Sequence, residues 1–261
     1  MFDSHCHVTD IEDPMAVLRE AWQRGVGSML SCGYNAESNA AVVQLRRKVP
    51  GLKIAIGLHP WFATESFDSV RALIEQELPA AIGECGLDGY AQDPEIPPFA
   101  LQLPVFEAQL DLAARMQVPV TVHSRRAVTE VVALVALFPN VRGILHAYSG
   151  SYEQVESLLA RGWLVGVGGA ITRPSAKRIR RMASRLALEH FVLETDAPAI
   201  GLEGVRPPLV RPHHVVDVAR AFAELRGLDF DAIVAQADCN AETMFGSTAF
   251  DTVLNSGTTV E

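Results

Sequence analysis

Short apolar runs alternate with longer amphipathic stretches along almost the whole chain. Each apolar run has the length of a strand covered on both faces, and the stretches between them have the 3.6-residue period of helices with one buried side. The pattern therefore predicts a repeated order of strand and helix. The predicted strands are residues 2–5, 28–32, 53–57, 81–84, 120–123, 142–146, 163–167 and 191–196.

Turn and capping residues place the ends of several predicted helices. The pair Asp13-Pro14 predicts a helix start, because aspartate caps helix N-termini and proline suits the first turn. Gly25 and Gly162 predict helix ends. The predicted helices include residues 14–24, 106–117, 127–138, 152–161, 213–226 and 229–245.

Eight strands that alternate with helices predict an α/β fold of the closed (β/α)8 TIM barrel type more readily than an open sheet. The length of 261 residues fits this fold, because one such barrel needs about 250. No GxGxxG or phosphate-loop motif follows a predicted strand, which disfavours nucleotide-cofactor folds. We expect a single barrel domain over residues 1–246 and a loose polar tail over residues 247–261.

The composition narrows the class of protein. A hydrophobic content of 49% supports a large core and argues against general disorder. The chain has no uninterrupted apolar run of about 18 residues and no secretory signal pattern, so we expect no membrane association. The four cysteines form no disulfide-like framework, which favours a cytoplasmic location. Nothing in the sequence indicates an obligate protein partner.

The charge is unevenly distributed. A net charge of -9 disfavours a protein that holds long stretches of nucleic acid. One segment is nevertheless basic, and its apolar positions at Ile179, Met182 and Leu186 predict an amphipathic helix. Its charged face is either solvated or binds phosphates, and the sequence leaves both open. The cations of this segment are Arg173, Lys177, Arg178, Arg180, Arg181 and Arg185.

Polar residues that bind metals gather where the predicted strands end. His5 and His7 point to the same face of the first strand, because side chains alternate along a strand. Barrel enzymes build their sites at the carboxyl ends of their strands. Any one such residue could be a hydrogen-bonded core group, but so many together would be costly without a cation. The candidate ligands are His5, His7, Glu84, His123, His146 and Asp196.

Two divalent ions of zinc, manganese or magnesium would suit this set of ligands. Neighbouring strands would supply the ligands of each ion. One ion would be bound by His5, His7 and Asp196, and the other by His123 and His146. We expect Glu84 to bridge the two, because no lysine follows a predicted strand and a carboxylated lysine is therefore excluded. Two such ions about 4 Å apart can activate a shared water and clamp a phosphoryl or carbonyl oxygen.

Seven motifs, taken in order, resemble those of the TatD family of metal-dependent hydrolases, and the resemblance spans residues 1–245. Within that family the chain is most similar to the YjjV-type branch, through His123-Ser124-Arg125-Arg126 and the glycine-rich stretch that starts at Gly166. The matching stretches are Asp3-Ser4-His5-Cys6-His7, Gly57-Leu58-His59-Pro60, Ile82-Gly83-Glu84-Cys85-Gly86-Leu87-Asp88, His123-Ser124-Arg125, His146-Ala147-Tyr148-Ser149-Gly150, Gly166-Val167-Gly168-Gly169 and Leu193-Glu194-Thr195-Asp196-Ala197-Pro198.

The resemblance implies an amidohydrolase-like barrel that hydrolyses ester bonds, with 3'-5' deoxyribonuclease activity as in some members. It places metal ligands at the same six positions, with Glu84 and Asp196 also catalytic. His59 would act in catalysis and near the scissile phosphate, and the further substrate contacts would be Arg125, Tyr148 and Arg206. Residues 204–208 depart from the family's asparagine-containing loop. The alternative is a binuclear hydrolase of a small ester or amide, so the substrate is either DNA or a small ester.

Overall fold

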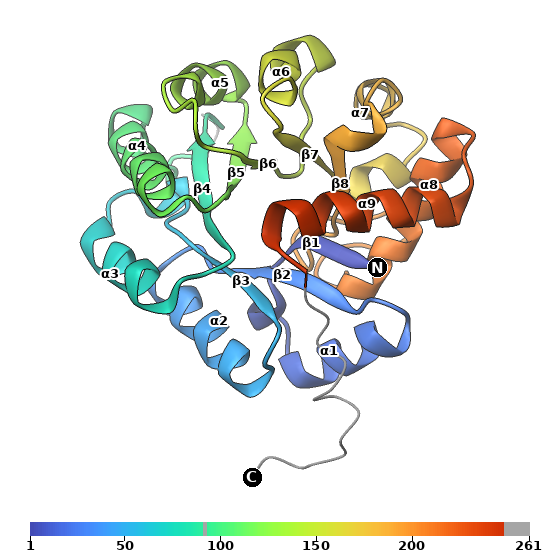
Figure 1. Cartoon of the computed structure of the whole chain (residues 1–261), viewed down its shortest axis with the longest axis horizontal. Coiled ribbons are helices and arrows are strands. Elements are labelled where there is room, and N and C mark those ends of the chain that lie inside the picture. Colours follow the sequence, from blue (N-terminus) through green and yellow to red (C-terminus); the bar gives the residue numbers. More distant parts are fainter. Residues whose placement is uncertain (91–92, 248–261) are drawn as a thin grey trace.

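A computed structural model of the chain describes residues 1–90 and 93–247. Eight parallel strands lie side by side in chain order, with helices packed around them (Figure 1). The main-chain nitrogen of Asp196 donates to the carbonyl of His5 at 2.9 Å, so the last strand meets the first and the barrel closes. The strands are β1 Phe2–Cys6, β2 Ser28–Cys32, β3 Lys53–Ile56, β4 Ala81–Asp88, β5 Val120–Arg125, β6 Gly143–Leu145, β7 Leu164–Val167 and β8 Phe191–Leu193.

The helices follow the strands as the pattern predicts, and the (β/α)8 barrel is confirmed. Short 3-10 segments occur at Val8–Asp10, Pro60–Phe62, Gly169–Thr172, Leu188–His190 and Pro212–His214. The α-helices are α1 Pro14–Gln23, α2 Ala36–Lys48, α3 Phe67–Glu77, α4 Phe99–Met116, α5 Val128–Ala136, α6 Tyr152–Leu159, α7 Lys177–Ala183, α8 Val215–Arg226 and α9 Phe230–Phe245.

Local capping explains where the first helices begin and end. The side chain of Asp13 accepts from the nitrogen of Ala16, so α1 starts at Pro14 as predicted. Gly25 follows the end of α1 with a φ of 86°, a backbone conformation that favours glycine. One predicted start was wrong, because α4 begins at Phe99 and Pro104 lies inside it. Pro104 lies beyond the first turn, so its missing N–H removes one hydrogen bond of the helix.

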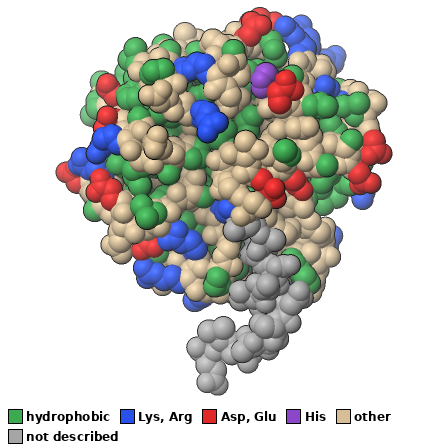
Figure 2. All heavy atoms as spheres, in the orientation of Figure 1, with side chains coloured by type: hydrophobic (Ala, Val, Ile, Leu, Met, Phe, Trp, Pro, Cys, Tyr) green, Lys and Arg blue, Asp and Glu red, His purple; other side chains and the backbone are tan. Residues whose placement is uncertain are grey.

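Apolar layers fill the space between strands and helices and close one end of the barrel. At the amino ends of the strands, Phe2, Leu30 and Val192 pack with Phe245 of α9 in one buried cluster. In Figure 1, α9 runs across this end of the barrel in front of β1. Acidic and basic side chains are interspersed over the same face (Figure 2). The opposite end, where the strands carry polar groups, is therefore the one left for chemistry.

The predicted domain boundary and the predicted absence of a membrane span can be compared with the described residues. The domain boundary at residue 246 stays a prediction, and the loose tail falls outside the described residues from Thr248 onward. Among the residues that the structure describes, no helix combines the length and the apolar composition that crossing a membrane requires.

Candidate metal centre

Glu84 lies at the centre of the polar cluster, at the carboxyl end of the barrel. Its Oε2 is 3.4 Å from His5 Nε2 and 3.3 Å from His7 Nε2. Its Oε1 is 3.1 Å from His123 Nδ1 and 2.9 Å from His146 Nε2. The two oxygens of one carboxylate thus face two separate pairs of imidazoles, which is the arrangement that a bridging ligand requires.

Asp196 completes the set on the side of the first histidine pair. Its Oδ1 lies 3.3 Å from His7 Nε2 and 3.8 Å from His5 Nε2. The residue lies shortly after the end of β8 and has a φ of 53°, which aspartate tolerates better than most residues. Oδ1 is buried and has no hydrogen-bond partner among the described residues. A buried, unpartnered carboxylate oxygen beside two imidazoles is suited to a cation.

In two histidines, the ring nitrogen that points away from Glu84 (the outer nitrogen) is bonded to the protein. This bond determines whether the inner nitrogen, which faces Glu84, carries a proton or a lone pair. His7 Nδ1 donates to the carbonyl of Cys32 at 3.0 Å, and His123 Nε2 pairs with Asp88 Oδ2 at 3.1 Å. The inner nitrogen of a neutral ring then presents a lone pair. His7 Nε2 also lies 3.3 Å from His5 Nε2. Lone pairs that face each other and carboxylates repel unless a cation lies between them, so these residues fit a divalent metal.

Buried charges set the pKa values of the cluster. Burial alone would raise the pKa of Glu84, but the neighbouring His146 and His59 hold it well below its usual range. Burial lowers the pKa of His5 to about 4. Burial also opposes a charge on His7, but the neighbouring carboxylates of Asp196 and Glu84 raise its pKa well above the usual value. The cluster therefore keeps its carboxylates ionised at neutral pH and favours positive charge among them.

His59 differs from the other four histidines of the cluster because its proton is on the ring nitrogen that faces Glu84. The main-chain nitrogen of Trp61 donates to His59 Nδ1 at 3.2 Å, so that ring nitrogen is an acceptor. Burial lowers the pKa of His59 to about 4, which keeps the ring neutral with its proton on Nε2. This Nε2 lies 3.3 Å from Glu84 Oε1. His59 therefore presents a hydrogen-bond donor to the cluster, whereas the predicted ligands present acceptors.

A cleft of about 640 Å³ opens above the cluster. Its floor carries Glu84, His123 and Asp196, and its walls carry both aromatic and cationic side chains. This combination can hold a planar ring beside a negatively charged group. The aromatic and cationic lining residues are Tyr34, Trp61, Phe62, Arg125 and Arg173.

The predicted substrate contacts divide into two groups. His59 and Arg125 line the cleft. The structure places Tyr148 and Arg206 outside that lining: the Tyr148 hydroxyl donates to the carbonyl of Ser151 at 2.8 Å, and Arg206 is exposed on the loop after β8. Arg173, which was considered only as part of the basic segment, lines the cleft.

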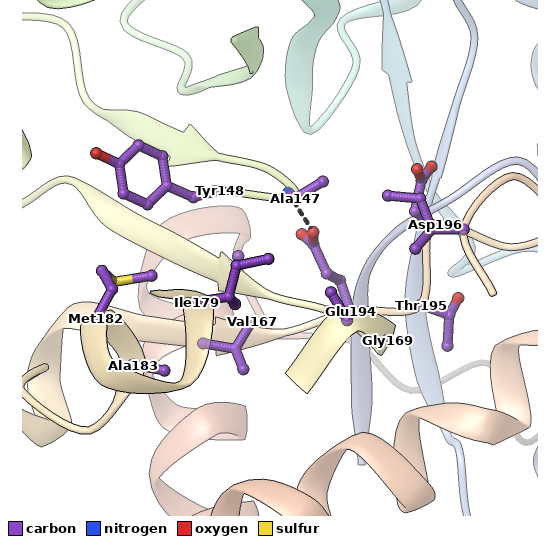
Figure 3. Close-up of a pocket in the computed structure, with 14 residues that line it drawn as sticks. Ala147, Tyr148, Val167, Gly169, Ile179, Met182, Ala183, Glu194, Thr195 and Asp196 are labelled. Atoms are coloured by element: carbon purple, nitrogen blue, oxygen red, sulfur yellow. Dashed lines mark hydrogen bonds between the residues drawn. The ribbon is translucent and has the colours of Figure 1, made fainter. Parts of the chain in front are cut away.

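Glu194 lies beneath the cluster and supports it from below. Its Oε1 accepts from the nitrogen of Ala147 at 2.5 Å and lies 3.9 Å from His146 Nδ1. Figure 3 shows this carboxylate pointing from the end of β8 toward Ala147, beside a small pocket of about 30 Å³. Burial raises its pKa to about 8. A Cβ added at Gly166 would lie 2.2 Å from Glu194 Oε2, so the carboxylate of Glu194 would have to move to accommodate it.

Asp88 is a buried residue to which sequence reasoning gave no role. Its Oδ2 accepts from Trp61 Nε1 at 2.8 Å and from Arg125 Nε at 2.9 Å, in addition to its contact with His123. Burial opposes its ionisation, but the bonds from His123 and Trp61 hold its pKa well below the usual value. The period of two along β4 could have revealed it, since Glu84 and Asp88 are four residues apart and share a face.

Replacing Asp88 by asparagine should lower activity and metal affinity by about 10- to 100-fold. An amide offers one acceptor oxygen and cannot hold His123, Trp61 and Arg125 together. Metal content and turnover of the purified variant would be measured against the exposed Asp111→Asn change, which should leave both unaltered. Equal metal content and equal turnover for the two variants would contradict an orienting role for Asp88.

A family model described as TatD related DNase matches residues 2–246 of the chain. The chain belongs to this family. The TatD-family chain is 35% identical to the "Uncharacterized metal-dependent hydrolase YjjV" of Escherichia coli K12, with 93% of this chain and 96% of that protein covered. It is 32% identical to the "3'-5' ssDNA/RNA exonuclease TatD" of Erwinia amylovora, over 94% and 100% of the two chains.

The fold comparison agrees with the TatD assignment. The crystal structure of YjjV from Escherichia coli superimposes with a TM-score of 0.86 at 33% identity and covers 95% of this chain and 98% of its own. The resemblance to the TatD family, including its YjjV-type branch, is therefore confirmed.

Proposed function

We propose that this protein is a metal-dependent hydrolase that removes nucleotides from the 3' end of single-stranded DNA at a binuclear centre. The observation that carries the proposal is the position of Glu84, whose two oxygens face two separate pairs of imidazoles on the floor of an open cleft. Its family and a relative named as a 3'-5' ssDNA/RNA exonuclease support the substrate class.

Six residues would hold the two ions. Neighbouring strands supply the ligands of each ion, and Glu84 lies between the two groups of ligands. Divalent zinc, manganese or magnesium bound there would lower the pKa of water and neutralise charge on a phosphoryl oxygen. The ligands are His5, His7 and Asp196 for one ion and His123 and His146 for the other, with Glu84 shared.

The residues around the ions would bind and orient the end of the strand. His59 holds a proton on Nε2 at the edge of the cluster, where it can donate to an oxygen of the scissile group. Arg125 and Arg173 line the cleft and can bind further phosphate oxygens through planar, paired donors. Trp61 is 47% exposed beside them and offers a surface on which a base can stack.

The overall charge fits removal from an end better than binding to an internal site. With a net charge of -9, the protein can bind only a few phosphates, and only where cations are locally concentrated. A terminal nucleotide requires few contacts. This reasoning also favours single strands over a duplex, since the cleft of about 640 Å³ has the size of a small-ligand site.

A cytoplasmic location is part of the proposal. Cys6, Cys32 and Cys85 are buried free thiols, and Cys239 is an exposed one. Exposed free thiols are typical of reducing compartments.

The deciding experiment compares substrates on one preparation of metal-loaded enzyme. Single-stranded DNA labelled at either end, the same sequence as RNA, a duplex and a small aryl ester would be assayed after reconstitution with Zn²⁺, Mn²⁺ or Mg²⁺. We expect a ladder that shortens from the 3' end of single-stranded DNA and no activity after chelation. Turnover of the small ester without cleavage of any nucleic acid would replace the proposal with the small-molecule alternative.

Replacing Arg125 by alanine should lower phosphodiester turnover by about 10- to 100-fold, because a hydrogen bond to a charged group contributes roughly 1.5–3 kcal/mol. Metal content should stay intact, since Asp88 keeps its bonds to Trp61 and His123. Arg125→Lys is the matched control, which keeps the charge and loses the planar pair of donors. Unchanged turnover by the alanine variant would remove Arg125 from the substrate site.

A further inference from the structure

A second hollow of about 810 Å³ borders the metal cleft. It lies where α5, α6 and α7 begin, at the end of the barrel that also carries the metal cluster. Ser149 and Ile179 line both hollows, so a chain that leaves the cleft past these residues enters the second one directly. We call it the α5–α7 groove. It is lined by Arg126, Val128, Thr129, Glu130, Ser149, Gln154, Ser175, Ala176, Lys177, Arg178 and Ile179.

The groove is cationic, although the protein as a whole is acidic. Arg126, Lys177 and Arg178 line it together with a single acidic residue, Glu130. All three cations are exposed, and none of them makes an ion pair within residues 1–90 and 93–247. Unpaired cations that line a concave surface attract a polyanion and concentrate it there.

Other cations of the basic segment are already used in the fold. Arg180 donates to the carbonyl of Ile171, and Arg173 donates to the carbonyl of Gly201. Arg185 pairs with Glu153 on α6. Lys177 and Arg178 line the groove, whereas Arg173, Arg180 and Arg185 make contacts within the fold and Arg181 is exposed outside the groove lining.

The size of the two hollows suggests how they share a substrate. A cleft of about 640 Å³ holds a ligand of drug size, which corresponds to the terminal part of a strand and not to its remainder. The remainder must leave the cleft along the surface. The groove that continues from Ser149 and Ile179 offers cations for the backbone and an apolar side chain at the junction.

We propose that the α5–α7 groove binds the 5' continuation of a single-stranded nucleic acid whose 3' end lies in the metal cleft. Phosphates of the nucleotides upstream of the scissile bond contact Lys177, Arg178 and Arg126. The proposal rests on the proposed exonuclease function and adds that substrates long enough to reach the groove are preferred.

The test uses metal-loaded enzyme and single strands of 2 to about 12 nucleotides. Arg178→Gln is compared with Arg181→Gln, because both remove one exposed cation from α7 and only Arg178 lines the groove. In the unaltered protein, kcat/KM should rise with length. Arg178→Gln should lose roughly threefold to fivefold on the longest strand, mainly through KM, and little on the dinucleotide. A double change at Lys177 and Arg178 should lose roughly tenfold.

Salt dependence gives an independent readout. The slope of log binding constant against log salt for the longest strand should become shallower by about 0.7 for each phosphate contact that is lost. Equal effects of Arg178→Gln and Arg181→Gln, or a kcat/KM that does not depend on length, would overturn the groove assignment while exonuclease activity itself persists. A protein that neither binds nor cleaves any strand would instead overturn the proposed function, and the groove assignment with it.

Discussion

Replacing Glu84 by alanine should lower hydrolysis by about three orders of magnitude or more, and should cost more than any single histidine change. Its two oxygens face His5 and His7 on one side and His123 and His146 on the other, so the loss affects both halves of the centre. Metal stabilisation contributes several kcal/mol, and about 1.4 kcal/mol corresponds to each tenfold change in rate.

The measurement needs turnover and metal content on the same sample, together with a check that the variant folds. His7→Ala is the comparison, because His7 contacts Oε2 of Glu84 and one carboxylate oxygen of Asp196, on one side of the centre only. It should lose less activity than Glu84→Ala and retain part of the bound metal. Near-normal turnover by Glu84→Ala, or a larger loss for His7→Ala, would show that Glu84 does not bridge two ions.

The fold was accessible from the sequence because its signals are local. Eight apolar runs of strand length, each followed by a helix signal, determine a barrel, and strand order then follows chain order. The convergence of His5, Glu84 and His146 could be predicted for the same reason, since all carboxyl ends of parallel strands meet at one end of the barrel. No information about loops was needed for that step.

The predicted substrate contacts Tyr148 and Arg206 stay predictions, because their positions depend on how loops and side chains turn. Tyr148 follows β6 closely, yet its hydroxyl bonds to Ser151, away from the cleft. The loop after β8 folds back on itself through the pair Leu202 and Val205, which leaves Arg206 exposed. A position after a strand end therefore does not by itself place a side chain in the cleft, because the path of the loop decides where it points.

The roles of Asp88 and the α5–α7 groove were missed for a different reason. Asp88 is fixed by contacts with Trp61 and His123, which are 27 and 35 residues away in the sequence. The groove joins the beginnings of three helices, and Arg178 differs from Arg181 only in what lies beside it. These contacts come from tertiary neighbours, although the period of two along β4 already places Asp88 on the same face as Glu84.

The second large effect concerns stability and tests how close β4 lies to β5. Gly86→Ala should lower the free energy of unfolding by about 2–6 kcal/mol, from backbone strain of roughly 1–3 kcal/mol and a similar cost of overpacking. Gly86 has a φ of 131°, and an added Cβ would lie 2.1 Å from the carbonyl oxygen of His123. That oxygen belongs to the backbone of β5 and cannot move away as a flexible side chain would.

Two other glycines separate the contributions to that loss. Gly25 also has a positive φ, 86°, but an added Cβ would meet nothing within 4 Å, so Gly25→Ala should show the strain alone. Gly27 has neither a positive φ nor a neighbour within 4 Å, and Gly27→Ala should be close to neutral. Thermal and denaturant unfolding of the three variants should rank Gly86→Ala well below Gly25→Ala, and Gly25→Ala below Gly27→Ala. Equal stability of the Gly86 and Gly25 variants would mean that the backbones of β4 and β5 do not approach closely at His123, and the positions of Glu84 and His123 relative to each other would then need revision.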